Sequence, residues 1–88
     1  MNFNLFIGDR ISEIRKQRNI SQENLANLAE IDRTYISSIE RGERSISLSV
    51  AIKITTALGV DLSILIKKND GTYINGFDLS AGDRVSKE

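Results

Sequence analysis

The sequence predicts an all-α fold: a compact bundle of five short helices over residues 1–68, followed by a C-terminal extension over residues 69–88. The chain has no proline and only 6% aromatic residues. Apolar residues recur at helical spacing, and capping residues divide the chain into short segments. At 88 residues, the chain is too short to bury a second independent core, so we expect one domain.

The first predicted helix covers residues 5–18. Its apolar residues Ile7, Ile11 and Ile14 recur at spacings of four and three, which places them on one face. Asn19 follows, and asparagine is second only to glycine in the left-handed position that ends a helix.

The second and third predicted helices are separated by a tight turn. Ser21 is a good N-cap for the second, which runs to about residue 29. Asp32 caps the third, which ends near Gly42. The residues that we expect on the buried faces of these two helices are Leu25, Leu28, Ala29, Ile36 and Ile39.

The fourth and fifth predicted helices show the same signals. Ser47 caps the fourth, which stops at Gly59, and Asp61 caps a short fifth helix over residues 62–67. The residues that we expect the fourth helix to bury are Leu48, Ala51, Ile54, Thr55 and Leu58.

The extension differs in kind from the helices. Residues 69–71 are typical of a turn, and residues 72–79 match a β-hairpin with Asn75 and Gly76 as its two-residue loop. A lone hairpin is marginal in water, so it would need to pack on the bundle or on a second subunit. A hairpin and a flexible tail both remain open.

The composition excludes several classes of function. The chain has no histidine and no cysteine, so it lacks the commonest general base, thiolate metal ligands and disulfides. It has no phosphate-binding or dinucleotide motif. We therefore expect no catalysis, no cofactor and no metal. Without a signal peptide or an apolar run that could cross a bilayer, we expect a cytoplasmic protein with no membrane partner.

The most informative segment is residues 22–41, QENLANLAEIDRTYISSIER. Ala26 supplies the small residue that is needed where two short helices cross. Leu25, Ile31 and Ile36 are among the apolar residues that such a pair needs on both sides of a tight turn. This is the pattern of a helix-turn-helix, whose second helix lies in the major groove of DNA.

The formal net charge of zero argues at first against this interpretation, because nucleic-acid binders usually carry a basic footprint. A local patch is therefore required. The outward residues of the second helix of the motif can all form hydrogen bonds and none is acidic; they are Arg33, Thr34, Ser37, Ser38 and Arg41. Any one of these arginines alone is better read as a surface charge, but together they favour DNA contact.

At these residues the chain resembles the Cro and xenobiotic-response-element (XRE) family of helix-turn-helix regulators. The resemblance covers residues 8–65 and includes SQENLA, YISSIERG and ALGV in order. The stretch DRTYISSIERGERSISL is most similar to the controller proteins of restriction–modification systems. The resemblance implies a transcriptional regulator that binds an operator in double-stranded DNA.

The resemblance also implies a role for each site residue. The base contacts fall to Arg33, Thr34, Ser37, Ser38 and Arg44, and the phosphate contacts to Gln22, Tyr35 and Arg41. Arg33 suits the O6 and N7 atoms of guanine, whereas Ser37 and Tyr35 match positions at the groove wall. Arg15 and Glu40 match an ion pair that ties the first helix to the third, so we expect them to be structural.

Three residues depart from the family's pattern. Asn19 replaces the usual glycine at little cost. Glu30 stands where the turn usually has a glycine with positive φ, so we expect a remodelled turn or some strain. Ile46 replaces a common proline before the fourth helix, which loosens the loop that carries Arg44.

The fifth predicted helix carries an apolar surplus that predicts a dimer interface: Leu62, Ile64, Leu65 and Ile66. These four side chains cannot all face one side of a helix, so some should be exposed on an isolated subunit. One recognition helix also reads too few base pairs to find one site in a genome, whereas a homodimer reads a pseudo-palindrome. The bound dimer would repress if its site overlaps a promoter and activate if it contacts RNA polymerase.

A second class of function stays open. The chain could be a protein-interaction module, such as an antitoxin whose segment from Asn69 onward wraps a partner protein. DNA binding would then be secondary, and a second protein would copurify with the chain.

Overall fold

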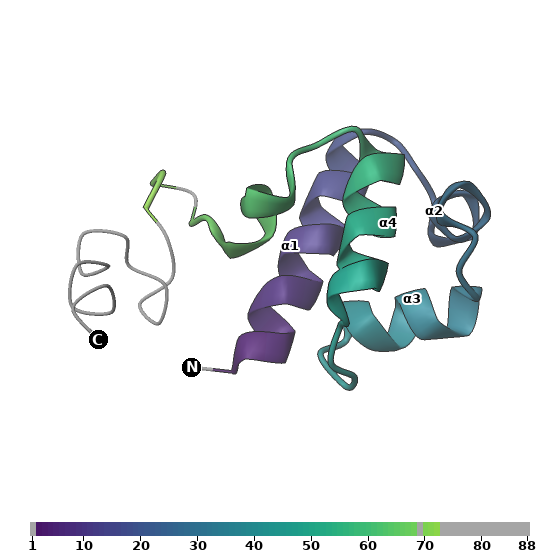
Figure 1. Ribbon diagram of the computed structural model, residues 1–88, viewed down its shortest axis with the longest axis horizontal. Coiled ribbons are helices and arrows are strands. Elements are labelled where there is room, and N and C mark those ends of the chain that lie inside the picture. Colours follow the sequence, from purple (N-terminus) through teal and green to yellow (C-terminus); the bar gives the residue numbers. More distant parts are fainter. Residues whose placement is uncertain (1, 69, 73–88) are drawn as a thin grey trace.

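Four α-helices and one 3₁₀-helix form the part of the chain that the computed structural model describes, residues 2–68 and 70–72 (Figure 1). The elements are α1 (Phe3–Gln17), α2 (Gln22–Ala29), α3 (Arg33–Glu40), α4 (Leu48–Leu58) and the 3₁₀-helix η1 (Leu62–Ile66). None of these elements is a strand, which confirms the all-α prediction for the described residues. The predicted hairpin, apart from Thr72, lies outside the described residues.

A polar side chain caps the N-terminus of each α-helix. The four caps are Asn2, Ser21, Asp32 and Ser47, and each accepts a hydrogen bond from a backbone N–H of the first turn at 3.0 to 3.2 Å. Three of them are the predicted ones. The fourth, Asn2, starts α1 two residues earlier than predicted, because its Oδ1 accepts from the N–H of Leu5 at 3.0 Å.

The same local motif ends every α-helix. A residue with positive φ follows each one: Asn19 at 58°, Glu30 at 58°, Gly42 at 74° and Gly59 at 73°. The next N–H then donates to the carbonyl five residues earlier, at 2.9 to 3.0 Å. The left-handed conformation expected at Asn19 is thus confirmed. Of the two alternatives expected at Glu30, a remodelled turn or some strain, the positive φ indicates strain. At Glu30 this conformation costs about 1 kcal/mol relative to glycine.

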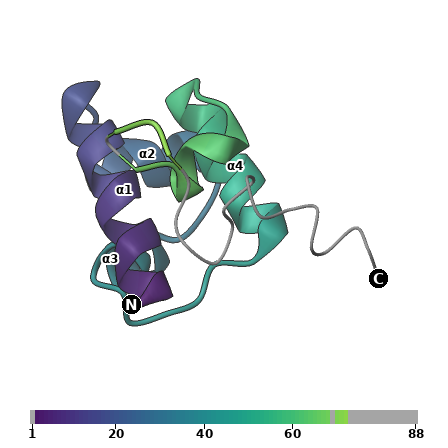
Figure 2. The ribbon, with the colours of Figure 1, turned by 90° about the vertical axis from the view of Figure 1, so that its left-hand side faces the viewer.

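The core lies between all five elements and includes Ile7, Ile11, Ile14, Leu25, Ala26, Ile36, Ile39, Ala51, Ile54, Leu58 and Leu65. Helix α3 packs on α1 and α2, and η1 packs on α1 and α4 (Figure 1 and Figure 2). This arrangement leaves α3 at the periphery, where one of its faces meets solvent.

Two of the predicted core residues are wrong. Leu28 is 61% exposed and Leu48 is 67% exposed. The buried residues of α2 are Leu25, Ala26 and Ala29, and Leu28 lies about 100° around the helix from Ala29, on the side away from Ala26. Leu48 is the first residue of α4 and lies beyond the edge of the core.

Gly8 sets how closely α1 and α3 approach. A Cβ at this position would lie 2.2 Å from the backbone carbonyl oxygen of Ile39 and 2.9 Å from that of Glu40. Because neither atom belongs to a side chain that can turn away, only glycine fits here. The C-terminal end of α3 is therefore fixed against the N-terminal half of α1.

The predicted fifth α-helix is instead a 3₁₀-helix of five residues. Its N-cap, Asp61, makes no side-chain capping hydrogen bond. The carbonyl of Ile64 accepts a hydrogen bond from Nε of Arg10 in α1 at 2.9 Å. Tertiary contact with α1 therefore holds this segment, and the five-helix prediction is corrected to four α-helices and η1 among the described residues.

Candidate nucleic-acid interface

Helices α2 and α3 form the predicted helix-turn-helix. Ala26 is 5% exposed where the two helices pack, and Ile31 in the turn packs against the core. Ile36 and Ile39 lie on the inner face of α3 and are fully buried in the core. The opposite face of α3 and the loop that follows it are therefore free to meet a ligand.

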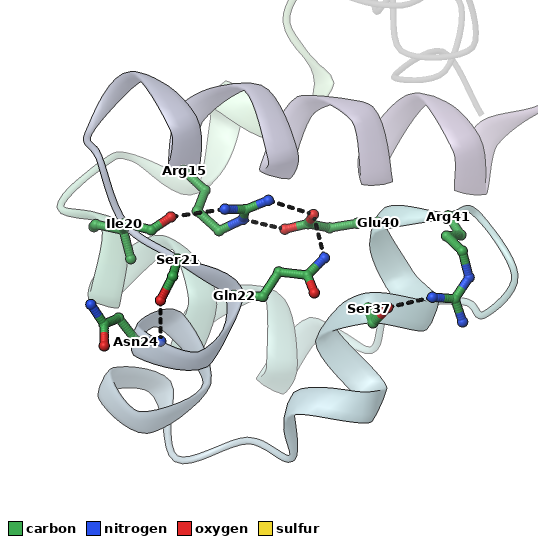
Figure 3. Close-up of polar contacts among 8 residues, drawn as sticks. All are labelled: Arg15, Ile20, Ser21, Gln22, Asn24, Ser37, Glu40 and Arg41. Carbon is green, nitrogen blue, oxygen red and sulfur yellow. Dashed lines mark hydrogen bonds and ion pairs between the residues drawn. The ribbon is translucent and has the colours of Figure 1, made fainter.

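A buried hydrogen-bond network fixes α3 to α1 and α2 (Figure 3). Arg15 donates from Nε and Nη2 to the two carboxylate oxygens of Glu40, at 2.7 and 3.0 Å, and from Nη1 to the carbonyl of Ile20 at 2.8 Å. Gln22 donates from Nε2 to the Oε1 of Glu40 at 3.0 Å. The structure thus contains the ion pair that the resemblance implies. The network makes α3 a rigid support for whatever its outer face binds.

Gln22 is partly committed to this network. One of its amide hydrogens bonds Glu40, which leaves the other for a ligand. As the first residue of α2, Gln22 also carries a backbone N–H that no helical carbonyl satisfies. The residue can therefore brace α3 and still offer donors to an anion.

Arg33 and Thr34 lie exposed in the first turn of α3. The backbone N–H of Thr34 is capped by Asp32 at 3.0 Å. Among the described residues, no side-chain hydrogen bond or ion pair restrains the Arg33 guanidinium. It is a fork of donors on a rigid helix end, and this geometry suits a planar pair of acceptors.

Ser38 does not share the outer face. It is only 9% exposed, because it lies beside Ile39 on the buried side of α3, and its Oγ accepts a long 3.5 Å hydrogen bond from Arg41. The predicted outward position of Ser38 is therefore corrected, and its burial disfavours the base contact, which stays a prediction. Ser37 is half-buried at the edge of the outer face, and its Oγ accepts a short hydrogen bond from Nη1 of Arg41.

The replacement of proline by Ile46 predicts a loose loop after α3, but the contacts in this loop hold it in place. The Arg44 guanidinium lies over the ring of Tyr35, 5.0 Å from its centroid. The Tyr35 hydroxyl donates to the carbonyl of Ser45 at 3.3 Å. Ile46 itself is half-buried against the core. Arg44 is thus positioned beside the outer face of α3.

Glu43 is the residue that the sequence analysis missed. Arg41 donates to its two carboxylate oxygens from Nε at 2.9 Å and from Nη2 at 3.0 Å. These hydrogen bonds stabilise the charged carboxylate and lower the pKa of Glu43 below its ordinary value. The signal in the sequence was the arginine and glutamate two residues apart in RGER.

The residues predicted as a dimer interface fall into three environments. Leu65 is 3% exposed and belongs to the core of its own subunit, so its assignment to an interface is corrected. Ile64 and Ile66 are half-buried against the core, and Leu62 is 36% exposed. Leu62 and Ile66 line a surface groove of about 450 Å³ with Phe3 from α1 and Leu48 from α4.

Two other kinds of site are absent from the described part of the chain. No helix within residues 2–68 and 70–72 is long and apolar enough to cross a membrane. The same residues contain no group of three or more acidic, histidine or cysteine side chains that could hold a metal ion.

The sequence of this chain is similar to those of known helix-turn-helix proteins. The model of a family described as helix-turn-helix matches residues 11–65. Control protein C.BamHI of Bacillus amyloliquefaciens is 48% identical over 60 residues, which cover 67% of this chain and 74% of that protein.

The fold of this chain is also similar to those of solved helix-turn-helix structures. The restriction–modification controller protein C.AhdI from Aeromonas hydrophila superposes with a TM-score of 0.69 at 39% identity, covering 70% of this chain and 94% of that one. SinR, a master regulator for biofilm formation crystallised in complex with DNA, superposes with a TM-score of 0.67 at 34% identity. That match covers 69% of this chain and 98% of the crystallised chain.

Proposed function

The chain belongs to the helix-turn-helix family of DNA-binding transcriptional regulators, and on that premise we propose that it binds a pseudo-palindromic operator as a homodimer. We further propose that it controls a restriction–modification operon, since C.BamHI and C.AhdI, to which it is similar, are a control protein and a restriction–modification controller. Activation would require the bound dimer to contact RNA polymerase, and repression only that its site overlaps a promoter.

The observation that carries the proposal is the unrestrained Arg33 at the exposed start of α3. The buried network of Arg15, Glu40 and Gln22 fixes the helix beneath it. A guanidinium at the N-terminal end of a recognition helix can donate two hydrogen bonds to O6 and N7 of a guanine. Thr34 beside it is the second candidate for a base contact.

The phosphate contacts would flank this pair of residues. Gln22 offers donors at the start of α2, and Arg41 lies at the other end of α3. Tyr35 and Ser37 lie at the edge of the outer face, and Arg44 is held beside them by its stacking on Tyr35. Donors spread along α3 in this way would fix its register in the groove, whereas base contacts specify the sequence.

The apolar groove between α1, α4 and η1 supports the homodimer. Phe3, Leu48 and Leu62 are 41%, 67% and 36% exposed, and all three line the groove. Large apolar side chains gathered on one surface mark an interface more often than isolated ones do. In a helix-turn-helix homodimer, the two copies of the recognition helix contact half-sites about 34 Å apart.

Selection from a pool of random-sequence duplexes tests the proposal. We expect the wild-type chain to enrich a palindromic motif, and Arg33→Ala to relax one position in each half-site and weaken binding about tenfold or more. Lys53→Ala is the matched control, because it removes the same charge from an exposed residue of α4 and should leave the motif unchanged.

Each other outcome has a distinct meaning. A motif without two-fold symmetry would contradict the homodimer. An Arg33→Ala variant that enriches the same motif would contradict base recognition by Arg33. If no motif emerges and binding stays weak at low salt, the protein-interaction module becomes the better interpretation.

A further inference from the structure

We propose that Glu43 occupies the place of a DNA phosphate on Arg41 in the free protein, so that DNA must displace it and Glu43 sets how tightly the protein binds. This inference rests on the proposed function, because it concerns a residue that would contact the DNA backbone. It identifies Glu43 as a positioning residue that acts through Arg41.

The geometry of the pair is that of an arginine bound to a phosphate. The two oxygens of Glu43 take Nε and Nη2 of Arg41, at 2.9 and 3.0 Å, which is the bidentate fork that guanidinium groups also form with phosphate oxygens. The remaining donor group, Nη1, bonds the Oγ of Ser37. The guanidinium therefore has no free edge for a second bidentate acceptor while Glu43 stays in place.

The turn after α3 brings the two residues together. Gly42 adopts φ of 74°, and the N–H of Glu43 donates to the carbonyl of Ser38 at 3.0 Å. A Cβ on Gly42 would lie 2.8 Å from the Cα of Leu5 in α1. The turn is thus fixed by its packing on α1, and it directs Glu43 back along α3 toward Arg41.

The pair is nevertheless exchangeable, because both side chains are more than half exposed, at 53% and 56%. An exposed ion pair contributes little net free energy and can be replaced by a competing anion. DNA offers a dense array of phosphates, so displacement is feasible but diminishes the gain from each Arg41–phosphate contact. The net charge of zero is consistent with carboxylates placed within the DNA-binding surface itself.

The test compares Glu43→Gln with wild type on the duplex that the wild-type chain selects from the random pool, at several salt concentrations. We expect Glu43→Gln to tighten binding about two- to tenfold for a dimer and to steepen the salt dependence. Glu13→Gln is the matched control, since Glu13 pairs with Arg10 on α1 at 2.8 Å and its loss changes the net charge equally. It should leave affinity unchanged.

Repeating Glu43→Gln in an Arg41→Ala background separates displacement from general repulsion. We expect most of the gain to vanish there, because no guanidinium is left to release. An equal gain in both backgrounds would mean that Glu43 merely repels phosphates and would overturn the proposal. Weaker binding by Glu43→Gln alone would also overturn it, since Glu43 would then orient Arg41 for DNA.

Failure of this inference is distinguishable from failure of the proposed function. If the wild-type chain selects no duplex, the proposed function fails. If it selects one and Glu43→Gln binds that duplex no better than Glu13→Gln does, only the role of Glu43 fails. A melting curve of each variant checks that it is folded, which the exposure of Glu43 leads us to expect.

Discussion

Two arginine–glutamate pairs lie at the C-terminal half of α3, and they have the same chemistry in opposite environments. Arg15 and Glu40 pair at 2.7 Å with side chains 10% and 6% exposed. Arg41 and Glu43 pair at 2.9 Å with side chains 53% and 56% exposed. Both arginines use the same bidentate fork, and the two pairs differ most in their burial.

The difference teaches that burial decides whether such a pair is part of the fold or part of the binding surface. The buried carboxylate cannot exchange its partner for water or for a phosphate, and loss of one partner leaves a charge in a poorly solvated site. The exposed carboxylate can exchange, so its removal frees an arginine without disturbing the core. Three changes, from the largest effect to the smallest, test this contrast.

Glu40→Gln should have the largest effect. It removes the charge opposite the buried Arg15 while keeping the shape of the side chain, and we expect it to reduce the free energy of unfolding by about 3 kcal/mol. Urea denaturation measures the loss. Glu13→Gln, which breaks the more exposed pair with Arg10, should reduce it by less than about 1 kcal/mol. Equal losses in the two variants would refute the contrast.

Gln22→Ala should have an intermediate effect, because it removes one half-buried hydrogen bond to Glu40 and leaves the ion pair intact. We expect a loss of about 1 kcal/mol in the free energy of unfolding, measured in the same urea series. A loss as large as that of Glu40→Gln would mean that the Gln22 amide contributes as much as the ion pair to holding α3 in place.

Glu43→Gln should have the smallest effect on the free energy of unfolding, and the pH dependence of this effect identifies it. The hydrogen bonds from Arg41 lower the pKa of Glu43 in the folded state. The pair therefore stabilises the fold at pH values above the pKa that Glu43 has in the unfolded chain. This contribution is lost as the pH falls through the lower pKa that Glu43 has in the folded state. The difference in the free energy of unfolding between wild type and Glu43→Gln, measured by urea denaturation, should be constant above about pH 5 and shrink at lower pH. A difference that changes between about pH 6 and 8 would contradict this.

Much of the site could be predicted from the sequence, and the two errors, at Ser38 and Glu43, have different causes. The exposed positions of Arg33 and Thr34 and the pairing of Arg15 with Glu40 all agree with the structure. Ser38 was misplaced because a short polar residue carries no signal of its own about which face of a helix it occupies. Glu43 was missed because its role depends on the direction of a turn.

The sequence by itself determined where each α-helix begins and ends. Caps such as Ser21 and Asp32, and left-handed residues such as Asn19 and Gly59, act through hydrogen bonds within five residues of the chain. Interactions of so short a range can be inferred from the residues that neighbour one another in the sequence.

Only the tertiary structure decided which side chains face the core and which face solvent. Leu65 is buried because η1 packs on α1 and α4, and η1 is a 3₁₀-helix held by Arg10 from α1, 54 positions away in the chain. Gly42 directs Glu43 onto Arg41 because the turn packs on Leu5. Such contacts join residues far apart in sequence, so local spacing cannot determine them.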